Sequence, residues 1–423
     1  MFTKASLGCL LVVGAVGLAA CGSSSSSSSS GGSSSSGGSG GGGANTVDFY
    51  SSLPLQGASS AQTTAMVNGA KLALKQANGK AGSFTVNYTS LDDSTAQAGN
   101  WDPGQTAADA RKAVQDPKAV YYFGEFNSGA SKISVPILNQ GGVPQISPAN
   151  TYVGLTTSEP GSAPGEPAKY YPTGKRNYLR IVPRDTIQAA ALLKTMKANG
   201  CTKVAIANDK DTYGQGLAAL IVLEKSKYGV SVVSNTGIDK TAPNFRSYAQ
   251  TLKAQGADCF VFAGVTANGA VQVSKDVNAA LPSARIYGGD GICESGFTNP
   301  AQHGIPAAVG PHFQCTVATQ NLTSYPGGKA FLAAYKAAYG GAQPDPYAIY
   351  GYEAMKLGLD TVAGLGAKGN DKAAILAALL ATKNRNSPLG SYGFDANGDT
   401  TLTAYGLYKV GSGHVPAFEK TIH

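Results

Sequence analysis

The sequence contains few of the residues on which enzymes commonly depend for catalysis. Only four histidines occur among 423 residues, and none has the spacing of metal ligands such as H-x-x-x-H. The absence of a C-x-x-C pair argues against a zinc or redox site. No Walker pattern occurs, and the Gly-Gln-Gly at residue 214 lacks the third glycine of a dinucleotide fingerprint. We therefore predict that the protein is not an enzyme and uses neither a metal nor a cofactor.

Charged residues are also scarce, at 14% of the chain, and no run of basic residues stands out. The formal net charge is +8. Nucleic-acid binding requires basic residues gathered on one face, so we do not expect it here. A modest positive field that attracts anionic solutes or anionic lipid is the most that this balance supports.

Long apolar runs are missing from the body of the chain, and the one short run lies near its start. Leu7 to Ala20 is apolar or small, follows Lys4 and ends in Leu-Ala-Ala before Cys21, which is the layout of a secretory signal. The run is shorter than the roughly 20 residues that cross a bilayer as a helix. Leu-Ala-Ala-Cys resembles the bacterial lipobox, in which the cysteine thiol receives a diacylglycerol. We interpret residues 1–20 as a lipoprotein signal peptide, and ordinary cleavage beside an incidental cysteine is the alternative.

Residues 22–43 are all glycine or serine. Such a run cannot bury enough apolar area to offset its chain entropy, so residues 21–43 should form a flexible tether after a lipidated Cys21. Its root-mean-square reach is about 25 Å. We expect an exported protein that a lipid anchors to the outer face of the cytoplasmic membrane, at the cell surface or in the periplasm.

Six cysteines are present, and four of them lie in the body of the chain. An even number in an exported protein makes disulfides the default, and four cysteines allow three pairings. Cys201 and Cys259 each stand at the start of a predicted strand, whereas Cys293 and Cys315 flank the next segment. We favour the pairs Cys201 with Cys259 and Cys293 with Cys315, and the other two pairings stay open.

Short apolar runs alternate with helical patterns throughout the body. Between residues 62 and 78, for example, Met66, Ala70, Ala73 and Ala77 repeat at a spacing of three to four. Near-continuous apolar strands separated by helices indicate parallel sheets covered on both faces. The predicted fold class is therefore α/β, doubly wound. The predicted strands begin at residues 46, 84, 119, 143, 178, 203, 230, 258 and 284.

The strand and helix pattern appears twice, over residues 46 to about 182 and 186 to about 316. Helices at 329–339, 347–363 and 371–382 complete the chain. Two lobes of similar build leave a cleft between the carboxyl ends of their strands, where open α/β sheets bind ligands. We therefore expect two doubly wound, parallel-sheet lobes that are joined by a hinge and enclose a ligand cleft.

The segment DANGD resembles the start of a calcium-binding loop, with Asp395, Asn397 and Asp399 in the first ligand positions. The twelfth position is Gly406, where such a loop needs a bidentate glutamate. We therefore expect a hairpin turn in this segment.

Small polar residues follow two neighbouring predicted strands. In YYFGEFNSGAS the strand turns at Gly124, and a helix is expected from Ser131. Small hydroxyl residues and free backbone N–H groups at a helix N-terminus are suited to holding a carboxylate. Ser128 either belongs to such a site or caps the helix. VPQISPANT repeats the arrangement with Asn150 and Thr151, so two strands bring hydroxyl groups to one rim.

A resemblance to a known family rests on five segments in the family's order. The body resembles a type I periplasmic binding protein of the leucine/isoleucine/valine-binding family, which serves ABC importers. The matching segments are GEFNSGAS, GVPQISPANT, VAIANDKDTYGQGL, YGGDG and YAIYGYEAMKLGL. The resemblance implies one lobe of residues 44–183 plus about 318–395, and a second of 184–317 plus about 396–423.

The resemblance also implies which residues hold an amino acid. Ser128, Ala149 and Thr151 match the family residues that bind the α-carboxylate, and Asp290 falls where the family places an acid for the α-ammonium. Asp290 lies between glycines, so a simple turn aspartate is the alternative.

Tyr213 and Tyr352 match the family's cleft tyrosines, with plain core aromatics as the alternative. Gln62 stands where leucine-binding proteins can place an aromatic residue against the ligand's side chain, and Thr266 stands where the family often has a tyrosine. Both changes make the side-chain pocket more polar or more open than a leucine site. The Pro- and Gly-rich insert at 158–178 is expected to be a surface loop, or else a wall of the cleft.

The function expected from these features is that of an extracytoplasmic solute-binding lipoprotein. It would capture a small amino acid or related carboxylate by lobe closure, as a monomer, and deliver it to the membrane subunits of an ABC importer. A sensor that shares the fold is the alternative. An exported α/β hydrolase is the alternative among enzymes, and the scarcity of histidine argues against it.

Overall fold

The segments predicted as strands form the two principal sheets of the protein. The computed structural model describes residues 45–423, so the predicted signal peptide, Cys21 and the tether lie outside the described residues. The first sheet contains, in spatial order, β2 (Lys80–Ala81), β3 (Phe84–Asp92), β1 (Thr46–Leu53), β6 (Ala119–Gly124), β7 (Gln145–Ser147) and β8 (Tyr178–Arg180). All its strand pairs are parallel except β2 with β3.

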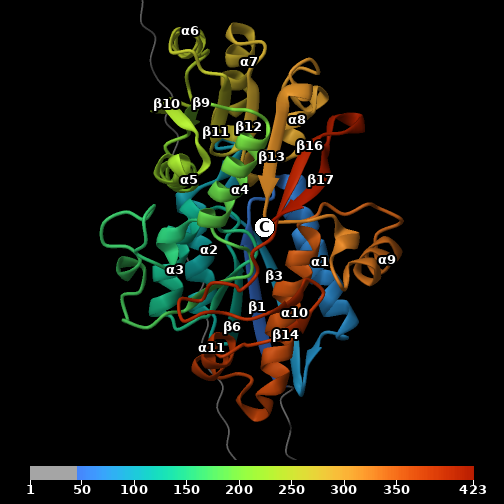
Figure 1. The fold of residues 1–423 in the computed structure, drawn as a ribbon. Coiled ribbons are helices and arrows are strands. Elements are labelled where there is room, and N and C mark those ends of the chain that lie inside the picture. The colour runs from blue at the N-terminus through green and yellow to red at the C-terminus, as the bar shows by residue number, and fades with distance from the viewer. Residues whose placement is uncertain (1–44) are drawn as a thin grey trace, which may run out of the picture. The chain divides into compact units, whose positions relative to one another are not determined.

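The second sheet combines a parallel part with an antiparallel edge. In spatial order it contains β10 (Ser231–Gly237), β9 (Lys203–Asn208), β11 (Cys259–Ala263), β12 (Arg285–Gly288), β13 (Phe313–Val317), β16 (Tyr405–Val410) and β17 (Pro416–Ile422). The pairs from β10 to β13 are parallel, and β16 and β17 add antiparallel strands beside β13 (Figure 1). Two small hairpins pair β4 (Ser94–Thr95) with β5 (Asn100–Trp101) and β14 (Arg385–Ser387) with β15 (Gly390–Tyr392).

Helices cover both faces of each sheet. The helices are α1 (Ser60–Gln76), α2 (Pro103–Gln115), α3 (Ser128–Gln140), α4 (Asp185–Ala198), α5 (Thr212–Glu224), α6 (Arg246–Ala254), α7 (Ala270–Ala280), α8 (Ser295–Thr298), α9 (Gly328–Ala338), α10 (Ala348–Gly364) and α11 (Lys372–Leu380). In the first sheet, Tyr122 packs with α2 and α3, whereas Phe49 belongs to the core under α1 and α10. In the second, Val261 packs with α4 and α5, and its neighbour Phe260 packs with α6 and α7. Because successive residues of a strand point to opposite faces, both lobes are doubly wound, as predicted.

The sequence patterns did not predict the strands at the C-terminal edge of the second sheet. β13, β16 and β17 were not among the expected strands. β17 is the antiparallel edge strand and mixes polar with apolar residues, so it lacks the continuous apolar run of a buried strand. The segment at Asp395 is a turn, as expected: Asp395 Oδ1 accepts hydrogen bonds from the backbone N–H groups of Asn397 and Asp399.

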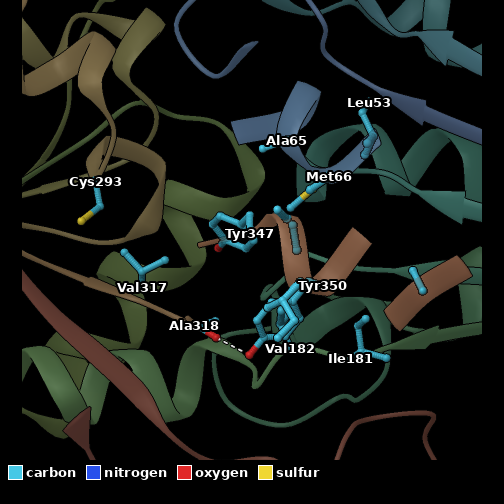
Figure 2. Close-up of a cluster of buried hydrophobic side chains, with 14 of the residues drawn as sticks. Leu53, Ala65, Met66, Ile181, Val182, Cys293, Val317, Ala318, Tyr347 and Tyr350 are labelled. Atoms are coloured by element: carbon cyan, nitrogen blue, oxygen red, sulfur yellow. Dashed lines mark hydrogen bonds between the residues drawn. The ribbon is translucent and has the colours of Figure 1, made fainter. Parts of the chain in front are cut away.

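The chain passes between the two sheets after β8, after β13 and before β16. Buried apolar side chains support these crossings, as Figure 2 shows for Ile181, Val182 and Ala318. Tyr350 of α10 donates a hydrogen bond of 2.7 Å to the carbonyl oxygen of Ala318, where the chain leaves β13. Packed side chains of the first lobe therefore stabilise the segments that connect the two sheets.

Two disulfide bonds cross-link the second lobe. Cys201 is joined to Cys259 and Cys293 to Cys315, which are the pairs that the sequence favoured. The first bond links the chain before β9 to β11, and the second links the segment after β12 to β13. None of the helices between residues 45 and 423 has the length and hydropathy that crossing a bilayer requires.

Candidate functional site

The first lobe contributes small polar residues at the carboxyl edge of its sheet. Ser128 is the first residue of α3, directly after β6, and Ala149 and Thr151 follow β7. Asn127 occupies the cap position, so Ser128 is not the cap. The Ser128 hydroxyl oxygen instead accepts a hydrogen bond of 3.4 Å from the backbone N–H of Tyr152. This bond ties the start of α3 to the loop after β7, and it brings the two predicted segments together.

The second lobe contributes a buried carboxyl group. Asp290 follows β12, is 8% exposed, and accepts hydrogen bonds of 3.1 Å from the Tyr347 hydroxyl and from the backbone N–H of Gly291. Burial raises the pKa of the Asp290 carboxyl, while the nearby polar groups of Tyr213, Gln188 and Tyr347 oppose the rise. The carboxyl is thus desolvated at a place where an ammonium group would stabilise its charged form.

These residues surround one small cavity of about 30 Å³. Its lining comes from both lobes and holds no lysine, arginine or histidine. The lining residues are Phe126, Asn127, Ser128, Ala149, Thr151, Tyr213, Val265, Asp290, Gly291 and Tyr347. Five of the eight candidate ligand residues are therefore in one place. A volume of this size is about that of one water molecule, so a larger ligand would enter only when the lobes move apart.

Two other candidates line neighbouring cavities. Gln62, in α1, lines a larger cavity of about 710 Å³ together with Tyr347, which also lines the small cavity. Figure 2 shows Cys293, Val317 and Tyr347, which belong to the lining of the larger cavity. Thr266 lines a cavity of about 480 Å³, and its hydroxyl donates a hydrogen bond of 3.3 Å to the Gly291 carbonyl.

Tyr352 does not reach the small cavity, and this corrects the expectation from sequence. Its hydroxyl donates to Gln76 Oε1 at 2.6 Å, and its ring packs against Phe331 with centroids 5.4 Å apart. The tyrosine of this segment that lines the small cavity is Tyr347, which directly precedes α10. At 3.6 residues per turn, five positions place Tyr352 about 140° around the helix from Tyr347. Tyr347 and Tyr352 therefore point to different sides of this segment, and only Tyr347 lines the small cavity.

Asp185 is a further acid near the cavity that the sequence analysis missed. It begins α4, is fully buried, and neither of its carboxylate oxygens has a hydrogen-bond partner. Burial and the charge of Asp290 raise the pKa of Asp185 well above its ordinary value, and Thr151 and Arg180 oppose this. Its position just beyond β8, in the segment RIVPRDT, could have predicted this place, because the carboxyl ends of the strands of one parallel sheet meet at one edge.

A contact between the lobes lies at the rim of the cleft. The Trp101 indole N–H, from β5 of the first lobe, donates a hydrogen bond of 3.3 Å to Asp211 Oδ2 at the start of α5. The lobes are therefore close together at this rim. The insert at 158–178 contributes no lining residue to the small cavity. It is held to the first lobe by Glu166, whose carboxylate accepts a hydrogen bond of 2.6 Å from the hydroxyl of Tyr152; the hydroxyl of Tyr170, within the insert, donates to the same carboxylate.

Similarity to known proteins was found in sequence and in structure. A family model described as periplasmic binding protein matches residues 51–414. An amino acid binding protein of Pseudomonas aeruginosa is 27% identical over 308 residues, which are 73% of this chain and 76% of that protein. A Leu/Ile/Val-binding protein of Rhizobium johnstonii is 28% identical over 370 residues, covering 86% of this chain and 92% of that protein.

Solved structures share the fold. A leucine-binding protein from Thermotoga maritima superposes with a TM-score of 0.73 at 22% identity, covering 89% of this chain and 98% of that one. A solute-binding protein of an ABC transporter from R. palustris, in complex with benzoate, superposes with a TM-score of 0.70 at 20% identity, covering 89% and 96%.

Proposed function

Because the chain belongs to the periplasmic binding protein family, we propose that it captures an α-amino acid between its two lobes and delivers it to an ABC importer. Proteins of this family bind solutes and are not enzymes, so the hydrolase alternative falls away. Membership in this family supports a location outside the cytoplasm.

The choice of ligand rests on one observation. One side of the small cavity presents groups that suit an anion, and the other side presents a group that suits a cation. The first lobe offers the N-terminus of α3 with the hydroxyls of Ser128 and Thr151, which suit a carboxylate. The second lobe offers the buried carboxyl of Asp290, which suits an ammonium. A ligand that carries both charges would satisfy both lobes only in the closed state, and this couples binding to closure.

The similar proteins support two ligand classes. Relatives are amino acid and Leu/Ile/Val-binding proteins, and one structural neighbour holds benzoate, a carboxylate without an amine. Asp290 distinguishes the classes, because a buried carboxylate gains from an ammonium and gains nothing from a ring without a hydrogen-bond donor.

The test is the variant Asp290→Asn. We expect it to weaken an L-amino acid at least about tenfold, because a charge-assisted hydrogen bond contributes roughly 1.5 to 3 kcal/mol, and to leave binding of a benzoate nearly unchanged. Thermal-shift screening of L-amino acids and benzoates first identifies the tightest binder of each class, since a ligand of the native state raises stability with its concentration. Calorimetric titration of both ligands then compares the variants.

The exposed Asp239, on the loop after β10, provides the matched control, and Asp239→Asn should bind both ligands like the wild type. Equal weakening of both ligands by Asp290→Asn would indicate a structural role for Asp290. Unchanged binding of the amino acid would place the ammonium site elsewhere.

The proposal extends to attachment at the membrane. The signal-like residues 1–20, the lipobox cysteine Cys21 and the Gly/Ser tether at residues 22–43 support a lipid-anchored receptor that samples solution and then docks on its permease. Since only a thiol accepts the thioether-linked lipid, Cys21→Ser should leave the protein unprocessed or released on membrane fractionation. A mature-sized, membrane-bound Cys21→Ser protein would contradict the lipoprotein proposal. A sensor would share the fold and the ligand site, and loss of uptake on deleting the adjacent permease would separate the two roles.

A further inference from the structure

One face of α5 continues from the small cavity to a contact between the two lobes. Tyr213, Gly216 and Leu220 of α5 follow one another at spacings of three and four residues, so they lie on one side of the helix. All three are buried, and Tyr213 lines the small cavity. The groups that pack on Gly216 and Leu220 therefore pack along the same side of α5 that borders the small cavity.

Residues of the first lobe occupy this face. A Cβ atom on Gly216 would lie 2.5 Å from Cδ2 of Tyr152, so the tyrosine ring packs directly on the backbone of α5. A Cβ atom on Gly161, in the insert, would lie 2.9 Å from the side chain of Leu220. Val153 is fully buried and belongs to the apolar core of the second lobe together with Leu220. We term this packing of Tyr152, Val153 and Gly161 on Gly216 and Leu220 the α5 contact.

Hydrogen bonds fix Tyr152 to the first lobe at three points. Its backbone N–H donates to the Ser128 hydroxyl at 3.4 Å, and its carbonyl accepts a hydrogen bond of 2.8 Å from Arg180 Nη1. Its hydroxyl donates to Glu166 Oε2 at 2.6 Å. All these partners belong to the first lobe, whereas the ring of Tyr152 packs on the second. Separation of the lobes would therefore break the α5 contact and keep these hydrogen bonds.

Glu166 fixes the hydroxyl of Tyr152 from within the insert. The glutamate is 5% exposed, accepts a hydrogen bond of 2.7 Å from the backbone N–H of Ala163, and pairs with Lys169 at 3.2 Å. Burial alone would raise the pKa of its carboxyl, but the hydrogen bonds from Tyr152, Tyr170 and the Ala163 N–H outweigh burial and hold the pKa below its ordinary value. The carboxylate is therefore charged at neutral pH, and it is a strong acceptor for the Tyr152 hydroxyl.

We propose that the α5 contact is a closure latch between the lobes, in which Glu166 is the positioning residue for Tyr152. Opening of the cleft exposes the Tyr152 ring and Val153 to water, which is unfavourable whether or not a ligand is present. The latch thus biases the ligand-free protein toward the closed state, and it lowers the amount of binding energy that a solute must supply for closure. This inference goes beyond the proposed function, because it does not depend on the identity of the solute.

Trp101 reports on the latch without any ligand. It is the single tryptophan of the chain, and its indole contacts both lobes. The indole N–H donates to Asp211 at 3.3 Å, and the ring packs on α3, where a Cβ atom on Gly129 would lie 2.5 Å from Trp101 Cζ2. Opening uncovers the side of the indole that faces Asp211. Acrylamide quenching of tryptophan fluorescence, together with the radius of gyration from small-angle X-ray scattering, therefore measures opening of the ligand-free protein.

The variant Gly216→Ala tests the latch. Alanine is the better helix former, so the substitution costs nothing in an open state, whereas in the closed state its methyl group meets the Tyr152 ring. In the ligand-free protein we expect a quenching constant at least about twofold higher than that of the wild type and a larger radius of gyration. Gly364→Ala, in α10 with no atom within 4 Å of the added Cβ, is the matched control and should change neither measurement. If Gly216→Ala also leaves both at their wild-type values, the α5 contact persists in every native state and the latch is overturned.

The variant Glu166→Gln tests the positioning role. It keeps the shape of the side chain and removes the charge from the acceptor of the Tyr152 hydroxyl, so quenching should rise, although less than in Gly216→Ala. Tyr170→Phe is the control, because it removes the other hydroxyl that donates to Glu166 and leaves Tyr152 bound. Both variants should lower the free energy of unfolding in urea, but only Glu166→Gln should raise the quenching of Trp101. No rise in Glu166→Gln, or an equal rise in Tyr170→Phe, overturns the positioning role of Glu166.

Discussion

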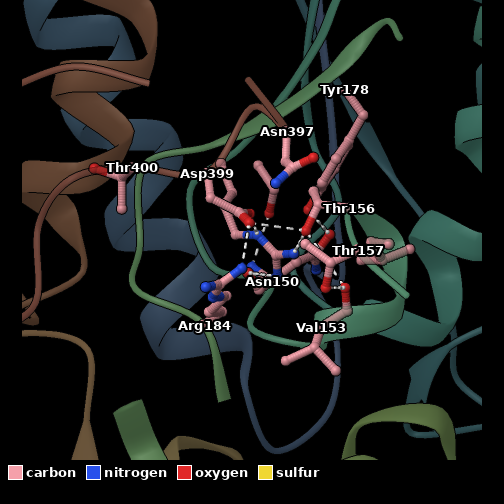
Figure 3. A network of polar contacts seen from close by, with 12 residues as sticks. Asn150, Val153, Thr156, Thr157, Tyr178, Arg184, Asn397, Asp399 and Thr400 are labelled. Carbon is pink, nitrogen blue, oxygen red and sulfur yellow. Dashed lines mark hydrogen bonds and ion pairs between the residues drawn. The ribbon is translucent and has the colours of Figure 1, made fainter. Parts of the chain in front are cut away.

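At the scale of single residues, the largest fully buried side chain of the described residues is that of Arg180, at the end of β8. It is fully buried, and its Nε donates a hydrogen bond of 2.6 Å to Asp399 Oδ1 in the turn before β16. Its guanidinium also donates to the carbonyls of Asn150 and Tyr152, at 3.2 and 2.8 Å. Asp399 accepts a further hydrogen bond of 3.0 Å from Arg184 in this network, which Figure 3 shows from close by. The network joins the loop after β7 to a crossing between the lobes.

Removing one partner of this pair should be strongly destabilising. Asp399→Ala leaves Arg180 buried without its counter-ion, and we expect a loss of about 3 to 5 kcal/mol in the free energy of unfolding, measured by urea denaturation. The control is Glu224→Ala, which removes the largely exposed ion pair with Lys227 and should cost no more than about 1 kcal/mol. Similar losses in both variants would show that the buried pair has no special role.

Sequence reasoning found single residues where a local rule applied. Ser128 and Thr151 were predicted because they follow adjacent strands of one parallel sheet, whose carboxyl ends share an edge. The partner of Arg180 could not be predicted in this way, because Asp399 is 219 positions away and its segment gave only a turn signal. Tyr352 was misplaced because a motif match does not fix the rotation of a helix. Asp185 was missed, since the burial of a carboxyl group is a property of tertiary packing.

At the scale of elements, α1 and α10 pack with their backbones in close approach. A Cβ atom on Gly69 of α1 would lie 2.0 Å from the Ala348 carbonyl oxygen, and one on Gly351 of α10 would lie 2.1 Å from that of Met66. Glycine is therefore required at both positions for the helices to approach this closely, although it is a poor helix former. These two helices cover one face of the first sheet, and Tyr347, which lines the small cavity, directly precedes α10.

A pair of substitutions within α10 tests this packing. Gly351→Ala should lower the free energy of unfolding by about 1 to 3 kcal/mol or more, because the methyl group forces the two helices apart. Gly364→Ala, at the end of the same helix with no atom within 4 Å of the added Cβ, should be neutral or stabilising by up to about 1 kcal/mol. Thermal and urea unfolding measure both. Equal tolerance at the two positions would refute the close approach.

Strands that form a continuous apolar run were predictable, whereas the edge strand β17 was not. β6 is buried at all six positions and β11 at all five, so each reads as a continuous apolar run. β17 has no fully buried position, and charged residues such as Glu419 and Lys420 interrupt its apolar pattern. Its pairing with β16 depends on a chain reversal at the end of the protein that carries no periodic signal.

At the scale of the whole molecule, buried carboxyl groups set the response of stability to pH. Burial raises the pKa of Glu125 to about 8. The Tyr122 hydroxyl donates a hydrogen bond of 2.8 Å to Glu125 Oε1, whereas Glu125 Oε2 has no hydrogen-bond partner. Burial also raises the pKa of Glu294 to about 7 and that of Asp209 to about 6, and it raises that of Asp93, beside Glu125, well above its ordinary value. In the unfolded chain, carboxyl groups titrate near pH 4.

The sign of the effect follows from proton binding. Between about pH 4.5 and pH 8 the folded protein retains protons on these carboxyls that the unfolded chain has lost, so the free energy of unfolding falls as pH rises through this window. The slope is about 1.4 kcal/mol per pH unit for each proton retained. Urea denaturation at pH 5, 6.5 and 8 should therefore show the highest stability at pH 5.

The variant Glu125→Gln, whose glutamine cannot ionise, should reduce the decline in stability between pH 5 and pH 8 by up to one such slope, whereas the exposed Glu419→Gln should not change the decline. Stability that rises toward pH 8 would mean that these carboxyls are ionised and paired in the folded protein. If Glu125→Gln leaves the decline in stability unaltered, the decline is caused by the other buried acids.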